Sequence, residues 1–269
     1  MNGIRQHKFD FREAPAFVNA YTCRSSSKDS IDIATTLDEN YLQGTMAAVF
    51  STKHKPKICR SVNSTFPYLK FEIYRFDSTR VRGKISKSVR QALDQPLNYA
   101  RIYLANILPS CVHRVIYLDS DVIVVDDVSK LREVVLDEKV IAAPEYCHAN
   151  FTNYFTESFW SDKELSRTFE GRRLCYFSRG VMILDVNKWR KEGYTQRVEE
   201  WMVIQKQKRM YNLGSLPPFL LIFAGNIKTS FLIDGINMDL VGITLKANVE
   251  AFIPVRLVCS IRVEKESHG

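Results

Sequence analysis

The sequence predicts an α/β fold in which a mainly parallel sheet is flanked by helices on both faces. Short apolar runs rich in β-branched residues alternate along the chain with segments of helical periodicity. Apolar residues make up 45% of the 269 positions, enough for a sizeable core. The length suits one or two domains, and a doubly wound α/β domain could use nearly all of it.

The first half of the chain supplies two predicted strands and two predicted helices. A strand is predicted at 31–37 and a helix at 41–49 (YLQGTMAAV), joined by polar residues. A polar junction between a strand and a helix N-terminus is a common ligand site in α/β folds. Alternating apolar residues predict a second strand at 69–76, and a helical pattern covers 84–107 with a break near Pro96.

The second half continues the alternation. Apolar runs predict strands, and helical spacing predicts a short helix after Asp127 and a longer one over 194–210. The predicted strands lie at 115–118, 122–125, 140–143 and 181–186. Residues 147–175 are aromatic and polar, and too irregular to predict a core layer. Core packing is the first interpretation of the aromatic residues there, and a sugar-binding platform is the alternative.

The stretch Arg114–Val128 (RVIYLDSDVIVVDDV) places two carboxylates, Asp119 and Asp121, between two apolar strand patterns. An ionised carboxylate in a dry place costs on the order of several kcal/mol unless a cation pairs with it. A divalent metal would resolve this conflict, and so would an Arg or Lys partner. Because ligands of α/β sheets bind beyond the carboxyl ends of the strands, the pair predicts a metal site for nucleotide phosphates. An Asp-containing turn capped by backbone amides is the alternative.

Three further residues are candidates for contact with a nucleotide. Arg101 lies on a predicted helix near the two carboxylates, where it could contact phosphate or base, or form a surface salt bridge. Asp38 and Tyr41 could bind a base or ribose, and could equally cap and pack the helix that follows them. The residue pattern alone leaves these alternatives open.

The net charge of +8 is spread along the chain. Its densest basic stretches, 80–90 and 188–208, carry no motif for RNA or DNA, so we expect no nucleic-acid partner. A solvated basic face is the first interpretation. Attraction of an anionic substrate, such as a sugar nucleotide or an acidic polysaccharide, is the alternative.

The sequence leaves the cellular compartment open. It contains no run of 18 apolar residues, and its first residues lack the apolar centre of a signal peptide. Either the protein is cytosolic or its targeting segment is missing from this chain. The six cysteines show neither a CxxC pair nor zinc spacing. Two sequons, at Asn63 and Asn150, would matter only in a secretory lumen.

Long ordered blocks carry more information than these short patterns. They include TLDENYLQGTMAAV, NYARIYLANILP, RVIYLDSDVIVVDDV, VIAAPEYCHANFTNYF and EEWMVIQKQKRMYNLGSLPPFLLIFAG. From about Phe9 to Lys228 the chain resembles plant galacturonosyltransferase-like proteins of the retaining glycosyltransferase family 8. The resemblance implies a nucleotide-diphospho-sugar transferase fold of GT-A type over 31–228, preceded by an N-terminal arm at 1–30. It also implies a Golgi enzyme that uses a UDP-sugar, proposed to be UDP-galacturonate, with manganese (Mn²⁺) in pectin or xylan synthesis of the cell wall.

The resemblance also assigns residues. It implies that Asp119 and Asp121 are the metal ligands, and it places donor-binding residues at six positions. These positions are Asp38, Tyr41, Arg101, Ser120, Glu145 and Ser178. No catalytic nucleophile is identified. The implied partners are a UDP-sugar donor and a polysaccharide acceptor, and membrane association would need a segment absent from this chain.

The chain departs from the family pattern at three places. Phe50 runs directly into Ser51 where the family has a further strand, so one strand of the sheet is predicted to be missing. The family segment FNTGV or FNSGV reads FSRGV here, so Ser178 replaces an Asn that lines the donor site and Arg179 introduces a large cation. Residues 229–269 lack two family segments, HRWNQHGLGGDN and LLHWSGKGKPW, of which the second supplies a third metal ligand (His) and a phosphate-binding Lys.

A shifted reading frame would account for this tail. With suitable codons and a preceding C, Ile233–Thr244 can be back-translated so that reading one nucleotide earlier gives HRWNQHGLGGDN, and Ile261–Gly269 likewise gives HSSGKGKPW. We hypothesise that 229–269 is an unrelated, out-of-frame tail and predict that it is disordered or loosely attached; the nucleotide sequence of the locus tests this. An incomplete site makes a second function possible: a catalytically inactive remnant, or a non-catalytic partner of active relatives.

Overall fold

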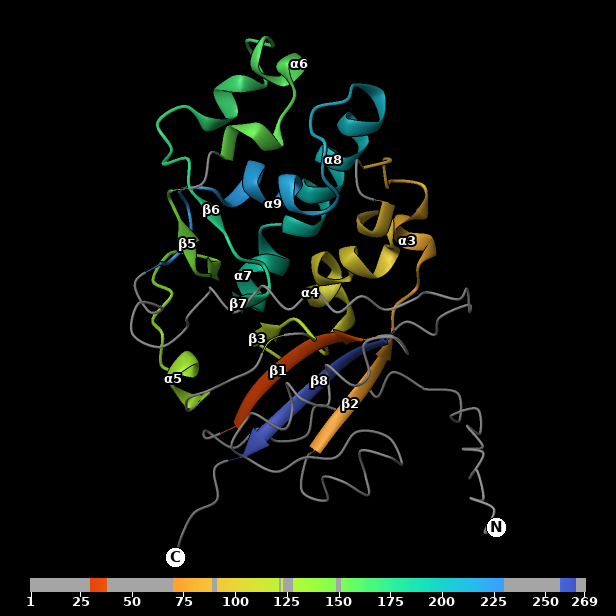
Figure 1. The fold of residues 1–269 in the computed structure, drawn as a ribbon. Coiled ribbons are helices and arrows are strands. Elements are labelled where there is room, and N and C mark those ends of the chain that lie inside the picture. The colour runs from red at the N-terminus through yellow and green to blue at the C-terminus, as the bar shows by residue number, and fades with distance from the viewer. Residues whose placement is uncertain are drawn as a thin grey trace, which may run out of the picture.

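The computed structural model describes residues 30–37, 70–88, 91–120, 122, 128–148, 151–229 and 257–264. Within these residues the main sheet has six strands in the order β2-β8-β1-β3-β7-β4 (Figure 1). The strands are β1 (Ser30–Leu37), β2 (Lys70–Arg75), β3 (Arg114–Leu118), β4 (Ile141–Ala142), β7 (Val181–Asp185) and β8 (Leu257–Glu264). A separate two-stranded sheet pairs β5 (Glu145–Tyr146) with β6 (Tyr176–Phe177).

The α/β class agrees with the sequence prediction, and the main sheet is mixed. β1 and β3 pair in parallel, with Ile33 opposite Ile116. β8 is antiparallel to both β1 and β2, and β7 is antiparallel to both β3 and β4. It follows that β1, β2, β3 and β4 run in one direction, while β7 and β8 run against them. The carboxyl ends of β1 and β3 therefore meet at one edge of the sheet.

In the main sheet, β8 lies between β1 and β2. The sequence predicted that a strand is missing from the part of the chain that joins these two strands. Ile261 of β8 is opposite Ile33 of β1 on one side and Phe71 of β2 on the other. Strand β8 thus provides partners for backbone groups of β1 and β2 that a simple deletion would leave open. Residues 257–264 are therefore paired in the sheet, whereas the sequence predicted that they belong to a loosely attached tail. The segment LVCSIRVE is rich in β-branched residues, which suit a pleated strand whatever their origin.

The helices of the described residues are short, apart from one of 14 residues. They comprise α3 (Thr79–Arg82), α4 (Leu104–Ile107), α5 (Ser129–Arg132), α6 (Glu157–Trp160), α7 (Val186–Lys191), α8 (Tyr194–Gln207) and α9 (Leu216–Phe223). The 3₁₀ turns are η2 (Gln91–Asp94), η3 (Pro96–Tyr103), η4 (Phe151–Tyr154) and η5 (Ser166–Phe169). Figure 1 shows α3, α4, α7, α8 and α9 together on one side of β1, β8 and β2. The helix predicted at 41–49 lies outside the described residues.

The helical pattern predicted over 84–107 is divided into η2, η3 and α4. The break falls at Pro96, the first residue of η3, where the ring fixes φ and removes a backbone donor. Tyr99, Ile102 and Tyr103 of η3 are buried in the core. Because η3 contacts β1, this turn carries Arg101 towards the edge of the sheet.

Aromatic rings fill the core between the sheet and the helices. Trp189 of α7 is 1% exposed, and its ring centroid lies 5.5 Å from those of Tyr194 and Phe223. Its indole N–H donates to Thr195 Oγ1 at 3.0 Å. This contact joins α7 to α8 and satisfies the one polar atom of the buried ring.

The expectation that residues 147–175 are too irregular for a core layer is wrong. Phe151, Phe155, Phe159 and Phe169 are all at most 5% exposed and belong to the hydrophobic core. Their ring centroids lie between 4.8 and 5.7 Å apart. Three single turns of helix carry Phe151, Phe159 and Phe169, and Phe155 follows the first of them, so no long periodic pattern marks these rings in the sequence. Core packing is therefore the correct interpretation of these phenylalanines.

Candidate active site

Asp119 lies directly beyond the carboxyl end of β3, as the sequence predicted. Its backbone N–H donates to the carbonyl of Gly180 at 2.8 Å, which holds it beside the start of β7. A Cβ atom added to Gly180 would lie 3.1 Å from Asp119 Oδ2. Glycine at this position therefore lets the carboxylate approach the neighbouring strand. The Asp119 side chain is 28% exposed, so ligands can reach it.

The Arg101 guanidinium is a two-point partner of the Asp119 carboxylate. Arg101 Nη2 lies 2.9 Å from Asp119 Oδ1, and Nη1 lies 3.3 Å from Oδ2. Nη1 also donates to the carbonyl of Arg179 at 2.8 Å. Arg101 is only 6% exposed, so the surface salt bridge considered from sequence is not what the structure shows. A buried, two-point pair of this kind fixes geometry far better than an exposed one.

Tyr117 completes the support of Asp119. Its hydroxyl donates to Asp119 Oδ1 at 2.7 Å, and the Arg101 guanidinium carbon lies 4.8 Å from the centre of its ring. Thr36 Oγ1 lies 2.9 Å from the Tyr117 hydroxyl oxygen and, since that proton points to Asp119, acts as the donor. Burial raises the pKa of Tyr117 well above its ordinary value, so the proton stays in place at neutral pH. The sequence analysis did not identify Tyr117 as a site residue. Its spacing was a usable signal, because Tyr117 lies two positions before Asp119 and such positions of a strand share a face.

The segment Phe177–Val181 (FSRGV) borders the carboxylate from the side of β7. Ser178 Oγ accepts from the Gly180 N–H at 3.2 Å, and the Ser178 N–H donates to the Pro144 carbonyl at 2.8 Å. Ser178 Oγ and Asp119 Oδ2 both lie within 4 Å of the space that a Gly180 side chain would occupy. The structure thus brings together three of the residues implied by resemblance, namely Arg101, Asp119 and Ser178.

Arg179 contributes a second guanidinium to the same region. Its Nη1 donates to Ser215 Oγ at 2.6 Å, and its guanidinium carbon lies 5.8 Å from the centre of the Phe219 ring. Burial, together with the neighbouring Arg101 cation, lowers the pKa of Arg179 to about 10. Arg179 is therefore still charged at neutral pH. Ser215, which comes from a distant part of the chain, gave no signal in the sequence.

Glu145 lies on β5, opposite Phe177 of β6 and hence next to the FSRGV segment. Its side chain is 7% exposed, and Oε2 lies 3.6 Å from Arg173 Nη1. Burial raises the pKa of Glu145, and the Arg173 cation opposes this shift. Among the described residues, Glu145 therefore pairs with Arg173, and the structure does not bring its carboxylate into the cluster around Asp119.

A disulfide joins Cys147 and Cys175 just beyond the β5–β6 pair. Glu145 and the two sulfurs lie within 4.8 Å of one another, but bonded sulfurs offer no thiolate to a metal. Disulfides persist mainly in oxidising compartments. This pairing could not be read from the cysteine spacing, which left the compartment open.

The remaining predicted site residues fall into two groups. Ser120 is half-buried in a turn in which the Val122 N–H donates to the Asp119 carbonyl at 3.2 Å. Asp38, Tyr41 and Asp121 lie outside the described residues.

The chemistry of Asp119 fits a divalent cation with oxygen preference. Oδ1 accepts from Tyr117 and Arg101, whereas Oδ2 accepts one bond from Arg101 and keeps a further lone pair. A partly exposed carboxylate oxygen of this kind is a ligand that such cations prefer.

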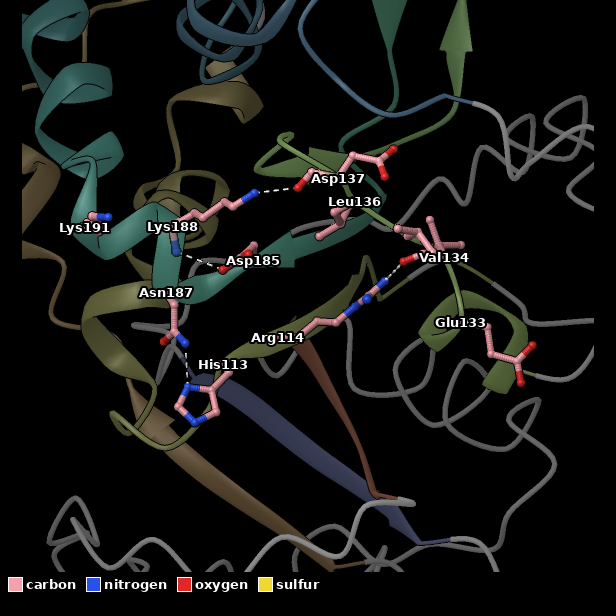
Figure 2. Close-up of a pocket in the computed structure, with 11 residues that line it drawn as sticks. His113, Arg114, Glu133, Val134, Leu136, Asp137, Asp185, Asn187, Lys188 and Lys191 are labelled. Carbon is pink, nitrogen blue, oxygen red and sulfur yellow. Dashed lines mark hydrogen bonds between the residues drawn. The ribbon is translucent and has the colours of Figure 1, made fainter.

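A cavity of about 520 Å³ lies at the opposite ends of the same strands (Figure 2). Arg114, at the start of β3, and Asp185, at the end of β7, both line it. Its polar groups are largely engaged: Arg114 donates to the Val134 carbonyl, and Asn187 bonds His113 at 2.7 Å. The strands thus separate this cavity from Asp119, and its groups serve to connect the loops around it.

The sheet and the supported carboxylate at its edge define the class: a glycosyltransferase fold of GT-A type. Two solved structures share the fold. An active-site mutant of LgtC aligns with a TM-score of 0.50 and 18% identity, covering 73% of this chain and 70% of its own. The bifunctional glycosyltransferase WbbM aligns with a TM-score of 0.56 and 16% identity, covering 78% of this chain and 40% of its own.

Residues 32–230 match the sequence profile of Glycosyl transferase family 8, and the chain belongs to that family. It is 62% identical over 236 residues to the Arabidopsis thaliana protein "Probable galacturonosyltransferase-like 4", covering 81% of this chain and 67% of that protein. It is 53% identical over 243 residues to "Probable galacturonosyltransferase-like 7" of the same plant, covering 82% and 67%. The resemblance found in the sequence is confirmed.

Family membership makes this chain a glycosyltransferase by class. Glycosyltransferases of this kind bind a nucleotide-sugar donor and a sugar acceptor, and commonly use a divalent metal. Among the described residues, no helix has the length and apolar character needed to cross a membrane.

Proposed function

We propose that the protein transfers galacturonate, with retention of configuration, from a UDP-sugar to a cell-wall polysaccharide such as pectin or xylan. The observation that carries this proposal is the Arg101–Asp119 pair at the edge of the sheet, with the carboxylate packed closely against Gly180. The names of two relatives, both probable galacturonosyltransferase-like proteins, support galacturonate as the donor sugar.

In this proposal Asp119 and Asp121 would hold the divalent metal, Mn²⁺. When bound, such a metal supplies positive charge to the diphosphate that leaves the sugar. Arg101 and Tyr117 fix the Asp119 carboxylate, so its position is set before the donor arrives. Asp38, Tyr41, Arg101, Ser120 and Ser178 would also contribute to the donor site, and so would Glu145, which the structure pairs with Arg173. No residue is assigned as nucleophile, and the acceptor hydroxyl would attack from the side on which the diphosphate leaves.

We also propose the Golgi lumen as the site of action. The Cys147–Cys175 disulfide supports an oxidising compartment. The names of the relatives support a role in polysaccharide synthesis.

Release of UDP from UDP-galacturonate tests the proposed function. Purified protein should release UDP in the presence of Mn²⁺, faster with a pectin or xylan oligosaccharide, and Asp119→Asn should lower the rate at least about 10²-fold. Arg167→Gln, which removes an exposed ion pair with Glu170, is a matched control and should keep the rate. Folded wild-type protein that releases no UDP under these conditions would contradict the proposal.

One observation favours a second candidate, a non-catalytic partner of active relatives. Arg101 already neutralises Asp119, and Arg179 adds a further cation that would repel a divalent metal. If this candidate is correct, the folded protein should bind an active relative while showing no Mn²⁺-dependent turnover. Co-purification with such a relative, followed by the UDP assay on each partner alone, separates the two functions.

A further inference from the structure

The described groups around Asp119 carry more positive than negative charge. Arg101 and Arg179 are two cations, and Asp119, which pairs with Arg101, is the described carboxylate nearest to them in the site. Arg101 uses both terminal nitrogens on that carboxylate, which leaves Arg179 as the surplus cation. Burying a cation without a fully matched anion costs free energy, so a ligand anion would be stabilised here.

Arg179 is held by neutral partners. Its guanidinium donates a hydrogen bond to the Ser215 hydroxyl and lies over the face of the Phe219 ring. Within the described part of the chain, no carboxylate lies within ion-pair distance of its guanidinium. Arg179 as a residue is half-buried, so part of it remains within reach of a ligand.

The orientation of Arg179 is fixed from both ends. Its carbonyl accepts from Arg101, so its backbone is locked to the carboxylate cluster. At the other end, Ser215 is 3% exposed and its hydroxyl donates to the Asn98 carbonyl at 2.8 Å, which leaves its lone pair for Arg179. An arginine held in this way loses little conformational freedom when it binds an anion.

We infer that Arg179 binds an oxyanion of the donor, next to the Arg101–Asp119 pair. The inference rests on the proposed function and adds to it a specificity-determining residue. A guanidinium fork matches a phosphate and a carboxylate equally well. In a UDP-uronate donor the oxyanion is therefore either the diphosphate or the carboxylate of the sugar.

Calorimetric titration with uridine, UDP, UDP-galactose and UDP-galacturonate tests this inference. Arg179→Gln keeps a polar side chain but removes the charge, and Arg179→Lys keeps the charge but removes the fork. If Arg179 binds the diphosphate, Arg179→Gln should lower the affinity for UDP about 10–100-fold and leave the affinity for uridine unchanged. The affinity of Arg179→Lys for UDP should lie between those of wild-type protein and Arg179→Gln. If Arg179 binds the sugar carboxylate, only the affinity for UDP-galacturonate should fall, while the affinities for UDP and UDP-galactose stay unchanged. Either result supports the inference.

Equal affinities of wild-type protein and both variants for all four ligands would overturn the inference while leaving the proposed function intact. Wild-type protein that binds none of the uridine nucleotides would overturn both. Arg167→Gln serves as the control, because that arginine is 76% exposed and pairs only within its own turn. Thermal unfolding of each variant shows whether it is folded. If Arg179→Gln does not fold, Arg179→Lys still provides the test.

Discussion

Arg101 Nη2 lies 2.9 Å from Asp119 Oδ1, and the same guanidinium donates to the carbonyl of Arg179. One buried side chain therefore ties the end of β3 to the turn before β7. Together with the bond from the Asp119 N–H to the Gly180 carbonyl, this residue positions the two segments that would border a nucleotide donor. Its replacement should affect both stability and binding.

Arg101→Gln should lower the free energy of unfolding by about 2–3 kcal/mol, because it leaves the Asp119 carboxylate without its buried partner. This loss of stability is small for a broken buried ion pair, because the Asp119 side chain is 28% exposed and water can solvate it. Urea unfolding measures the difference. Arg167→Gln should change stability by less than about 0.5 kcal/mol. Equal effects of the two substitutions would contradict the role given to Arg101.

Gly180→Ala should disturb the site with little effect on the rest of the fold. The new Cβ would lie 3.1 Å from Asp119 Oδ2, so the carboxylate must move by a few tenths of an ångström and strain its bonds to Arg101. We expect UDP binding to weaken at least about tenfold. Gly83→Ala is the matched control, because nothing lies within 4 Å of its added Cβ and its φ of −72° suits alanine. Unchanged UDP affinity in Gly180→Ala would show that the carboxylate position is not critical.

Removal of the Cys147–Cys175 disulfide should destabilise the protein by roughly 3 kcal/mol. The bond closes a loop between residues 28 apart, and opening it restores conformational entropy to the unfolded chain. Urea unfolding of the double variant Cys147→Ser and Cys175→Ser, against wild-type protein without reductant, measures this loss. A difference below about 1 kcal/mol would mean that the packed phenylalanines alone hold the segment.

Glu145 should make the protein less stable as the pH rises. Burial raises the folded-state pKa of its carboxyl above its ordinary value of 4.5, so between the two pKa values the folded state binds more protons than the unfolded state. The contribution of Glu145 to the free energy of unfolding is therefore greatest below pH 4.5. It falls as the pH rises through the folded-state pKa. Glu145→Gln removes the effect and should be more stable than wild-type protein at neutral pH, with the difference vanishing at low pH. Unfolding curves between pH 4 and 8 measure it; the opposite slope would show that the Arg173 ion pair outweighs burial.

The positions of the central strands could be predicted from the sequence alone. Runs at 31–37, 115–118 and 181–186 agree within a residue with β1, β3 and β7, because alternating β-branched residues carry a local signal. The place of Asp119 followed from the same signal, since a carboxylate directly after a buried run must lie at the end of a strand. Arg101 was a candidate by its type and its place near the carboxylates.

Partnerships between distant residues were decided by the tertiary structure. Nothing local to Leu257–Glu264 indicates that this segment lies between β1 and β2, since strand pairing depends on contacts far apart in the chain. The same holds for Ser215, which reaches Arg179 across 36 positions. The sequence by itself determined the positions of β1, β3 and β7 and which residues carry charge. Only the folded chain decided that Arg101 neutralises Asp119 while Arg179 remains beside them as a surplus cation, because burial and distance set those interactions.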